Sequence, residues 1–285
     1  MKKLLVLAFV FVWGLSFAQG GKVMDQLFLK SKILDSERKY AIYLPSDYEY
    51  SEREYPVLYL LHGAGNDHTG WVQFGEVKSI ADKAIIEGLS TAMIIVMPDA
   101  QTQKRGYFNS LEGDWDYENY FFQEFIPFIE DTYRIKNEKK YRAIAGLSMG
   151  GGGSFIYALR HPNYFSSACP LSAFLGALSF DDYYQKNIKK FKNIRKDKVF
   201  NYYSNHEALS VIKNQTDENL KSVRWYIDCG DDDYLYEKNS LAHIALKKRG
   251  IPHEYRVRDG AHNWTYWRSA LPEVLGFVSE HFHQN

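Results

Sequence analysis

Three residues spaced along the second half of the chain could together perform nucleophilic catalysis, and the first is Ser148. It lies in residues 146–150 (GLSMG), between an apolar run and a stretch of small residues that predicts a helix. A Gly-x-Ser-x-Gly sequence at a strand-to-helix turn is typical of a nucleophile elbow, in which glycines leave room for neighbouring elements. A phosphate-binding loop is the alternative, but no lysine follows these glycines. The pattern predicts that Ser148 is a nucleophile.

A serine hydroxyl needs a base to accept its proton, and the base needs a carboxylate to orient it. His262 lies between a predicted strand that ends near Val257 and the last predicted helix, where the base belongs in a serine, acid, histidine order. The carboxylate is expected in the turn at residues 230–233 (GDDD), directly after another predicted strand. Asp233 is preferred and Asp232 is the alternative, while the other acidic residues form the turn.

Two backbone N–H groups must stabilise the oxyanion that forms when a serine attacks a carbonyl carbon. We expect one from Met149, directly after the serine. The second should come from the loop that follows a strongly apolar segment at residues 55–61, with Ala64 preferred over Gly63. We expect His62 to fix this loop rather than to carry a proton.

Short apolar segments alternate with amphipathic ones along the chain, and they predict the elements that position these residues. Strands are expected at residues 25–33, 38–44, 55–61, 93–97, 141–145, 167–172, 223–229 and 255–257. The first two should form an antiparallel hairpin. The strand and helix alternation that follows predicts an α/β fold, with a mostly parallel central sheet and helices on both faces.

Residues 174–220 interrupt this alternation, because they contain no clear strand pattern and many lysines. We therefore expect a lid-like insertion above the sheet. Its lysines are interpreted as a solvated helix face; a lid whose charge favours anionic substrates is the alternative.

Composition and charge limit the class of function. The chain has 285 residues, with 35 Lys and Arg against 35 Asp and Glu, so its formal net charge is zero. A neutral chain gives no reason to expect nucleic acid or a charged membrane as a partner. The two cysteines, Cys169 and Cys229, lie in predicted strands and are expected to be free thiols.

The first 18 residues have the pattern of a secretory signal peptide. Lys2 and Lys3 precede an apolar run, and small residues precede the expected cleavage site. The apolar run is shorter than the ~20 residues that a membrane-spanning helix needs. We therefore expect residues 19–285 to form a single domain that is secreted or periplasmic.

Four motifs, in this order, resemble the esterase D family of α/β-hydrolases. They are LLHG at 60–63, GLSMGG at 146–151, CGDDD at 229–233 and GAHNW at 260–264. Within that family the chain is similar to secreted feruloyl and acetylxylan esterases. The resemblance implies an α/β-hydrolase fold and ester hydrolysis without a metal or cofactor, and it favours Asp233 as the acid.

Together, the resemblance and the export signal predict an esterase that removes feruloyl or acetyl groups from plant polysaccharide. Aromatic rings stack on phenolic acids and on sugars, and we expect Tyr107, Trp115 and Trp264 to bind the polysaccharide or oligosaccharide ester. The alternative enzymes are an S-formylglutathione hydrolase, found in the same family, and a siderophore esterase. From another class, the alternative is a carbohydrate-binding protein on an inactive hydrolase scaffold.

Overall fold

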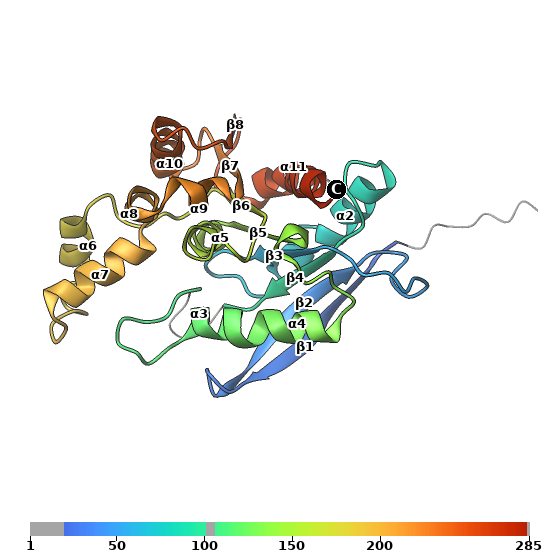
Figure 1. The fold of residues 1–285 in the computed structure, drawn as a ribbon, viewed down its shortest axis with the longest axis horizontal. Coiled ribbons are helices and arrows are strands. Elements are labelled where there is room, and N and C mark those ends of the chain that lie inside the picture. Colours follow the sequence, from blue (N-terminus) through green and yellow to red (C-terminus); the bar gives the residue numbers. More distant parts are fainter. Residues whose placement is uncertain (1–19, 101–105, 284–285) are drawn as a thin grey trace, which may run out of the picture.

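The computed structural model describes residues 20–100 and 106–283 of the 285-residue chain. The signal peptide predicted at residues 1–18 lies outside these described residues. Figure 1 shows a central sheet with helices on both sides. Within the described ranges, no helix is both long enough and apolar enough to cross a membrane.

The central sheet has eight strands in the order β1-β2-β4-β3-β5-β6-β7-β8 (Figure 1). The strands are β1 (Lys22–Ser31), β2 (Ser36–Leu44), β3 (Val57–Leu61), β4 (Ile94–Pro98), β5 (Arg142–Leu147), β6 (Ser167–Leu171), β7 (Arg224–Gly230) and β8 (Glu254–Arg258). β1 pairs antiparallel with β2, and β2 pairs antiparallel with β4. All other neighbours are parallel. The prediction of a mostly parallel sheet with an antiparallel edge hairpin is confirmed.

Burial explains why the positions of the strands can be predicted from the sequence. Every residue of β3, β4, β5 and β6 is buried, because helices cover both faces of the sheet there. The edge strand β1 instead alternates between exposed and partly buried residues along much of its length. Cys169 in β6 and Cys229 in β7 are buried free thiols, as expected.

The helices form a layer on each face of the sheet. The helical segments are α1 (Gly70–Gln73), α2 (Val77–Ile86), α3 (Tyr117–Tyr120), a π-helical turn (Phe121–Phe125), α4 (Ile126–Thr132), a 3-10 turn (Lys139–Tyr141), α5 (Met149–Arg160), α6 (Phe180–Lys186), α7 (Lys196–His206), α8 (Ala208–Asn214), α9 (Asp217–Lys221), α10 (Tyr236–Lys248) and α11 (Trp264–His283). One hydrophobic core joins the sheet to α2 and α11. A second core on the other face joins it to α3, α4, α5, α8 and α10.

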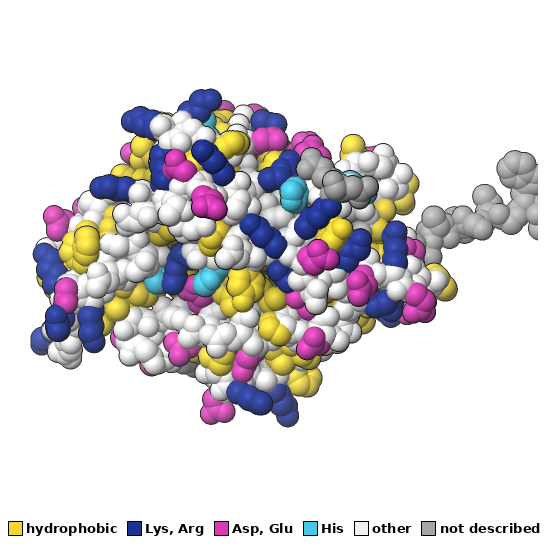
Figure 2. Space-filling model, in the orientation of Figure 1, with side chains coloured by type: hydrophobic (Ala, Val, Ile, Leu, Met, Phe, Trp, Pro, Cys, Tyr) yellow, Lys and Arg dark blue, Asp and Glu magenta, His cyan; other side chains and the backbone are white. Residues whose placement is uncertain are grey.

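Residues 174–220 form the expected insertion, which contains α6 to α9 and no strand. It extends from the sheet at the left of Figure 1, where the ribbon runs from yellow to orange. Its lysines are exposed, and Figure 2 shows Lys and Arg side chains gathered at this end of the molecule. The exposure of these lysines agrees with the interpretation that they form a solvated helix face.

Buried polar groups attach the insertion to the body of the protein. Glu118 in α3 accepts hydrogen bonds from Arg160 Nη1 at 2.6 Å and from His161 Nε2 at 2.7 Å, and His206 of α7 lies 3.8 Å away. Its buried carboxyl has a pKa lowered to about 2, because these partners outweigh the effect of burial. This cluster anchors the last turn of α7 to α3 and α5.

Candidate active site

Ser148 occupies the turn between β5 and α5 in a backbone conformation that non-glycine residues rarely adopt. Its φ is 54° and its ψ is −115°. The Ser148 N–H donates to the Leu171 carbonyl at 2.9 Å, and the Ser148 carbonyl accepts from Gly152 N–H at 3.0 Å and Phe174 N–H at 2.9 Å. Hydrogen bonds from β6, α5 and the start of the insertion therefore hold the strained turn in place.

The two glycines of the motif are required by close backbone contacts. A Cβ atom on Gly146 would lie 2.4 Å from the Gly150 carbonyl oxygen. A Cβ atom on Gly150 would lie 2.6 Å from the carbonyl oxygens of both His62 and Leu61. These distances are too short for any side chain without backbone movement, so the elbow depends on glycine at both positions.

The structure brings Ser148, His262 and Asp233 together in one hydrogen-bonded line. His262 Nε2 lies 2.9 Å from Ser148 Oγ, and His262 Nδ1 lies 2.8 Å from Asp233 Oδ2. Ser148 follows β5, Asp233 lies in the loop after β7, and His262 lies in the loop between β8 and α11. This arrangement can deprotonate the serine hydroxyl through a histidine whose ring is oriented by a carboxylate.

Asp233 is fully buried, and burial alone would raise its pKa. Hydrogen bonds from His262, from the Leu235 N–H at 2.8 Å and from the Ser172 hydroxyl outweigh that effect, so the pKa of Asp233 is lowered. The carboxylate is therefore ionised at neutral pH, as a residue that stabilises an imidazolium must be.

Ser172 and Trp267 also position these groups, although no sequence pattern pointed to them. Ser172 is buried, has a φ of 44°, and follows β6. Its Oγ accepts a hydrogen bond from Trp267 Nε1 at 3.1 Å, and the Trp267 ring lies edge-on to the His262 ring at 4.9 Å. Ser172 and Trp267 thus form a second connection between the acid and the histidine.

The loop at residues 62–64 lies against the nucleophile turn. A Cβ atom on Gly63 would lie 3.4 Å from Ser148 Cβ. His62 is buried, with Nδ1 2.8 Å from the Gly63 carbonyl oxygen and Nε2 accepting from the Ala100 N–H at 2.9 Å. Burial lowers the pKa of His62, so its neutral ring fixes the loop that carries Ala64. Met149, the first residue of α5, has an N–H that no carbonyl of the same helix can accept.

The other aspartates near the acid have structural contacts. Asp228, fully buried in β7, accepts hydrogen bonds from Arg258 at 2.8 Å and from the hydroxyls of Tyr226 and Tyr266. Asp231 Oδ1 accepts from the N–H groups of Asp232 at 3.1 Å and of Gly260 at 3.0 Å. Asp231 thereby ties the loop before His262 to the turn after β7.

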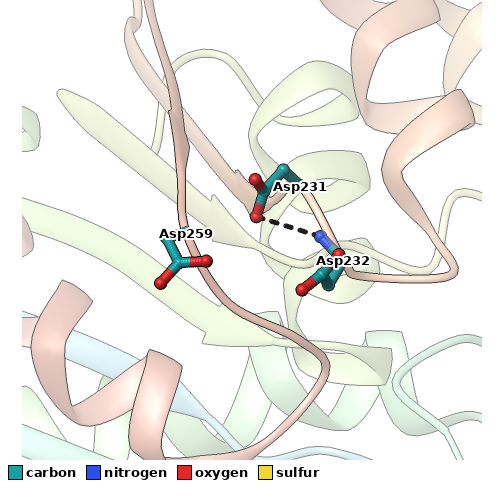
Figure 3. Close-up of side chains that lie close together, drawn as sticks. All are labelled: Asp231, Asp232 and Asp259. Atoms are coloured by element: carbon teal, nitrogen blue, oxygen red, sulfur yellow. Dashed lines mark hydrogen bonds between the residues drawn. The ribbon is translucent and has the colours of Figure 1, made fainter.

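Figure 3 shows Asp231 and Asp232 facing Asp259 across this junction. The three exposed carboxylates lie within 4.8 Å of one another and could offer oxygen ligands to a cation. The hydrogen bonds of Asp231 explain the position of its side chain without an ion. The cluster is therefore part of the loop structure.

Comparison with known proteins identifies the family. Residues 31–278 match the family described as "Putative esterase". The chain belongs to this esterase family. A solved structure of a ferulic acid esterase is 36% identical, covers 92% of this chain and 99% of its own, and superposes with a TM-score of 0.81. The α/β-hydrolase fold predicted from the sequence is confirmed, as is membership of a family of carboxylic ester hydrolases.

Two further comparisons differ in what they show. The endo-1,4-beta-xylanase/feruloyl esterase of Xylanibacter ruminicola is 30% identical over 240 residues, which are 82% of this chain and 28% of that protein. The esterase spans less than a third of the length of the first curated relatives that it matches. An S-formylglutathione hydrolase from Agrobacterium tumefaciens, 20% identical with a TM-score of 0.74, covers 93% of this chain and 97% of its own. At that identity the likeness shows the fold alone.

The structure corrects one of the three aromatic residues expected to contact substrate. Tyr107 is only 1% exposed, its hydroxyl donates to the His62 carbonyl at 3.0 Å, and its ring packs against Gly153 of α5. Its ring faces are therefore inside the core, and Tyr107 supports the loop at residues 62–64 instead of contacting substrate. The sequence could not show this, because the segment at residues 107–120 contains several aromatic residues and no pattern that separates buried from exposed ones.

Trp264 and Trp115 are partly buried in the esterase. The ring of Trp264 packs edge-on against Trp71 and Trp267, both at 5.3 Å. Trp115 stacks on Tyr117 at 6.4 Å. A substrate contact for either ring stays a prediction.

Two exposed aromatic residues beside the catalytic candidates were missed in the sequence. Tyr234 is 72% exposed, and its ring lies 4.7 Å from the His262 ring. Phe174 is 56% exposed, and its backbone is bonded to Ser148. Tyr234 directly follows the acid, and Phe174 lies shortly after β6. These two positions are the only sequence signals that could have indicated them.

Proposed function

We propose that this chain is a serine esterase that removes feruloyl groups from plant polysaccharide. The observation that carries the proposal is the line of hydrogen bonds from Ser148 Oγ through the His262 ring to Asp233, with distances of 2.9 and 2.8 Å. The exposed rings of Tyr234 and Phe174 beside this line support an aromatic acyl group. The likeness to a ferulic acid esterase over nearly the whole of both chains supports the same substrate.

In the proposed first step, Ser148 Oγ attacks the carbonyl carbon of the ester while His262 Nε2 takes the hydroxyl proton. The negative charge that develops on the carbonyl oxygen is stabilised by the N–H groups of Met149 and Ala64. His262 then donates its proton to the departing sugar oxygen, and the acyl group stays on Ser148. Asp233 orients the ring and stabilises its positive charge throughout.

In the second step, water attacks the acyl-enzyme carbonyl while His262 Nε2 accepts a proton from the water. Collapse of the tetrahedral intermediate releases the carboxylic acid, and His262 returns its proton to Ser148 Oγ. Water contributes the oxygen of the released acid, so the enzyme ends unchanged.

We also propose where the enzyme acts. Residues 1–18 would direct export, and residues 19–285 would act as one catalytic domain outside the cytoplasm. A polysaccharide ester is available there, whereas S-formylglutathione is a cytosolic thioester. The neutral net charge suits an uncharged polymer.

A substrate panel tests the proposal. Residues 19–285 and the Ser148→Ala variant are assayed on methyl ferulate, acetylated xylo-oligosaccharide and S-formylglutathione. We expect the highest kcat/KM on methyl ferulate and a loss of at least ~10³-fold in kcat for the variant. A clear preference for the thioester would refute the polysaccharide substrate, and a preference for the acetyl ester would refute the feruloyl group while leaving the mechanism in place.

A further inference from the structure

Asn239 is a buried amide close to the acid that no step of the proposed reaction uses. It lies in the first turn of α10, and its side chain has no exposed surface. A buried amide is costly unless its oxygen and its N–H groups all find partners. The partners of Asn239 therefore indicate what it stabilises.

The amide of Asn239 makes three hydrogen bonds to the backbone of two segments. Its Oδ1 accepts from the Ala173 N–H at 3.2 Å, and its Nδ2 donates to the Ala173 carbonyl at 3.0 Å. The same Nδ2 donates to the Leu235 carbonyl at 2.9 Å. A primary amide combines an acceptor with two N–H donors, so neither leucine nor aspartate, which have the same size, can make all three bonds.

The contact with Leu235 leads directly to the acid. Leu235 is the residue before α10, and its N–H donates to Asp233 Oδ1 at 2.8 Å. The backbone N–H of Asn239 reaches the Leu235 carbonyl only at 3.4 Å, which is long for a hydrogen bond. The side chain of Asn239 supplies the shorter bond to that carbonyl. It therefore helps to fix the residue that holds the Asp233 carboxylate.

The contacts with Ala173 lead to the same carboxylate by a second route. Ala173 follows Ser172, whose hydroxyl donates to Asp233. Ala173 lies beyond the end of β6, and the Asn239 amide bonds to both of its backbone groups as a neighbouring strand would. On the other side the segment packs on α5, where a Cβ atom on Gly151 would lie 2.9 Å from Ala173 Cα. Ala173 is therefore held between α5 and α10.

The nucleophile turn has supports of its own. The Ser148 N–H bonds to the Leu171 carbonyl of β6. The Ser148 carbonyl accepts from the Gly152 N–H of α5 as well as from the Phe174 N–H. Of these bonds, only the one from Phe174 adjoins the residue that Asn239 holds. Loss of the Asn239 amide should therefore disturb the acid more than the serine.

We propose that Asn239 is a positioning residue that keeps Asp233 in line with His262, acting through Leu235 and Ser172. The inference rests on the proposed esterase function, in which the carboxylate orients the histidine ring. A displacement of about 1 Å in a catalytic arrangement can cost roughly 10²-fold in rate. The buried amide thus affects the rate of the reaction without contacting the substrate.

Kinetics on methyl ferulate test this role in Asn239→Leu, which keeps the size of the side chain and removes the three hydrogen bonds. We expect kcat to fall roughly 10–100-fold while KM stays within about threefold. Leu246→Ala is the matched control, because Leu246 is also fully buried in α10 and its truncation lowers stability through lost packing. Its kcat should stay within about twofold at a temperature well below the melting transition. An equal loss of kcat in Leu246→Ala and Asn239→Leu would overturn the positioning role.

A double-mutant cycle tests whether Asn239 acts through the acid. Added to Asp233→Asn, the Asn239→Leu change should lower kcat by less than about threefold, because the carboxylate that it positions is already absent. A further loss of roughly 10–100-fold in the double variant would overturn the proposal. Asn239→Ala replaces Asn239→Leu if the leucine variant does not fold. It leaves room for water to bond to the freed backbone groups, but water does not fix their positions, so the same loss of kcat is expected.

Proton NMR separates this inference from the proposed function, because it needs no substrate. The proton between His262 Nδ1 and Asp233 Oδ2 should give a downfield signal in the wild type and in Leu246→Ala. We expect this signal to shift or disappear in Asn239→Leu. That result supports the positioning role even if the wild type does not hydrolyse methyl ferulate, in which case only the proposed function fails. An unchanged signal in Asn239→Leu would overturn the positioning role even if methyl ferulate is hydrolysed.

Discussion

Replacing Asp233 with asparagine changes few atoms and should nevertheless remove almost all activity. The carboxylate accepts hydrogen bonds from His262 Nδ1 at 2.8 Å, from the Leu235 N–H at 2.8 Å and from the Ser172 hydroxyl. An amide has one accepting oxygen and one donating NH₂ group. If that oxygen stays with the Leu235 N–H, the NH₂ group faces His262 Nδ1.

Facing a donor, His262 must accept at Nδ1 and therefore carry its proton on Nε2. That nitrogen lies 2.9 Å from Ser148 Oγ and could no longer take the serine proton. In serine proteases the corresponding change costs on the order of 10⁴-fold in kcat, which is about 5.4 kcal/mol at about 1.36 kcal/mol per tenfold. We expect a similar loss for Asp233→Asn.

The fold should survive this change. Weakened charge-assisted hydrogen bonds cost about 2 kcal/mol, which lowers Tm by roughly 4–8 °C in a domain of this size. Steady-state kinetics on methyl ferulate and thermal melts together separate lost chemistry from lost stability. More than about 1% of wild-type kcat in Asp233→Asn would refute the tautomer argument.

Neighbouring aspartates provide matched controls. In Asp231→Asn the remaining side-chain oxygen can still accept from Asp232 and Gly260, so kcat should stay within about threefold. Asp228→Asn should chiefly lower stability, because Asp228 is buried and bonded to Arg258. A larger loss of kcat in Asp231→Asn or Asp232→Asn than in Asp233→Asn would show that the acid is misassigned.

Three further predictions concern the nucleophile, the glycine that follows it and a buried carboxyl group. An organophosphonate should label Ser148 stoichiometrically, as mapped by peptide mass spectrometry. Labelling of another residue would contradict the assignment of Ser148 as the nucleophile. Gly150→Ala should lower the free energy of unfolding by at least about 3 kcal/mol in denaturant titrations, whereas Gly276→Ala, whose nearest contact is 3.4 Å, should cost nothing. Burial raises the pKa of Glu207 from its ordinary 4.5 to about 8. The stability that the neutral Glu207 carboxyl contributes is therefore fully present below about pH 4.5 and is lost as the pH rises through about 8. The free energy of unfolding of Glu207→Gln relative to the wild type should therefore increase by at least about 1 kcal/mol between pH 5 and pH 8.5. A difference that does not change with pH would contradict this prediction.

Features set by local sequence could be predicted well. Strands β3 to β6 are buried on both faces, so each is an uninterrupted apolar run. The elbow around Ser148 needs glycine at fixed neighbouring positions, and its motif therefore marks it directly. The order of strands then indicated which loops would carry the acid and the histidine.

Features that depend on packing between distant segments could not be predicted. Tyr107 and Phe174 both lie in aromatic or apolar stretches, yet the first is in the core and the second is exposed. Their burial depends on contacts with α5 and the turn before it. The Tyr107 ring packs against Gly153, and the Phe174 N–H donates a hydrogen bond to the Ser148 carbonyl. Sequence composition contains no record of such contacts.

The start of the insertion is fixed by contacts with two of the catalytic candidates. Ser172 contacts the acid through its hydroxyl, and two residues later the Phe174 N–H binds the nucleophile's carbonyl. Residues 172–174 are therefore held by both catalytic candidates at the point where the insertion begins. Beyond that point, the length or sequence of the insertion can change while these anchoring bonds preserve the geometry of Ser148 and Asp233.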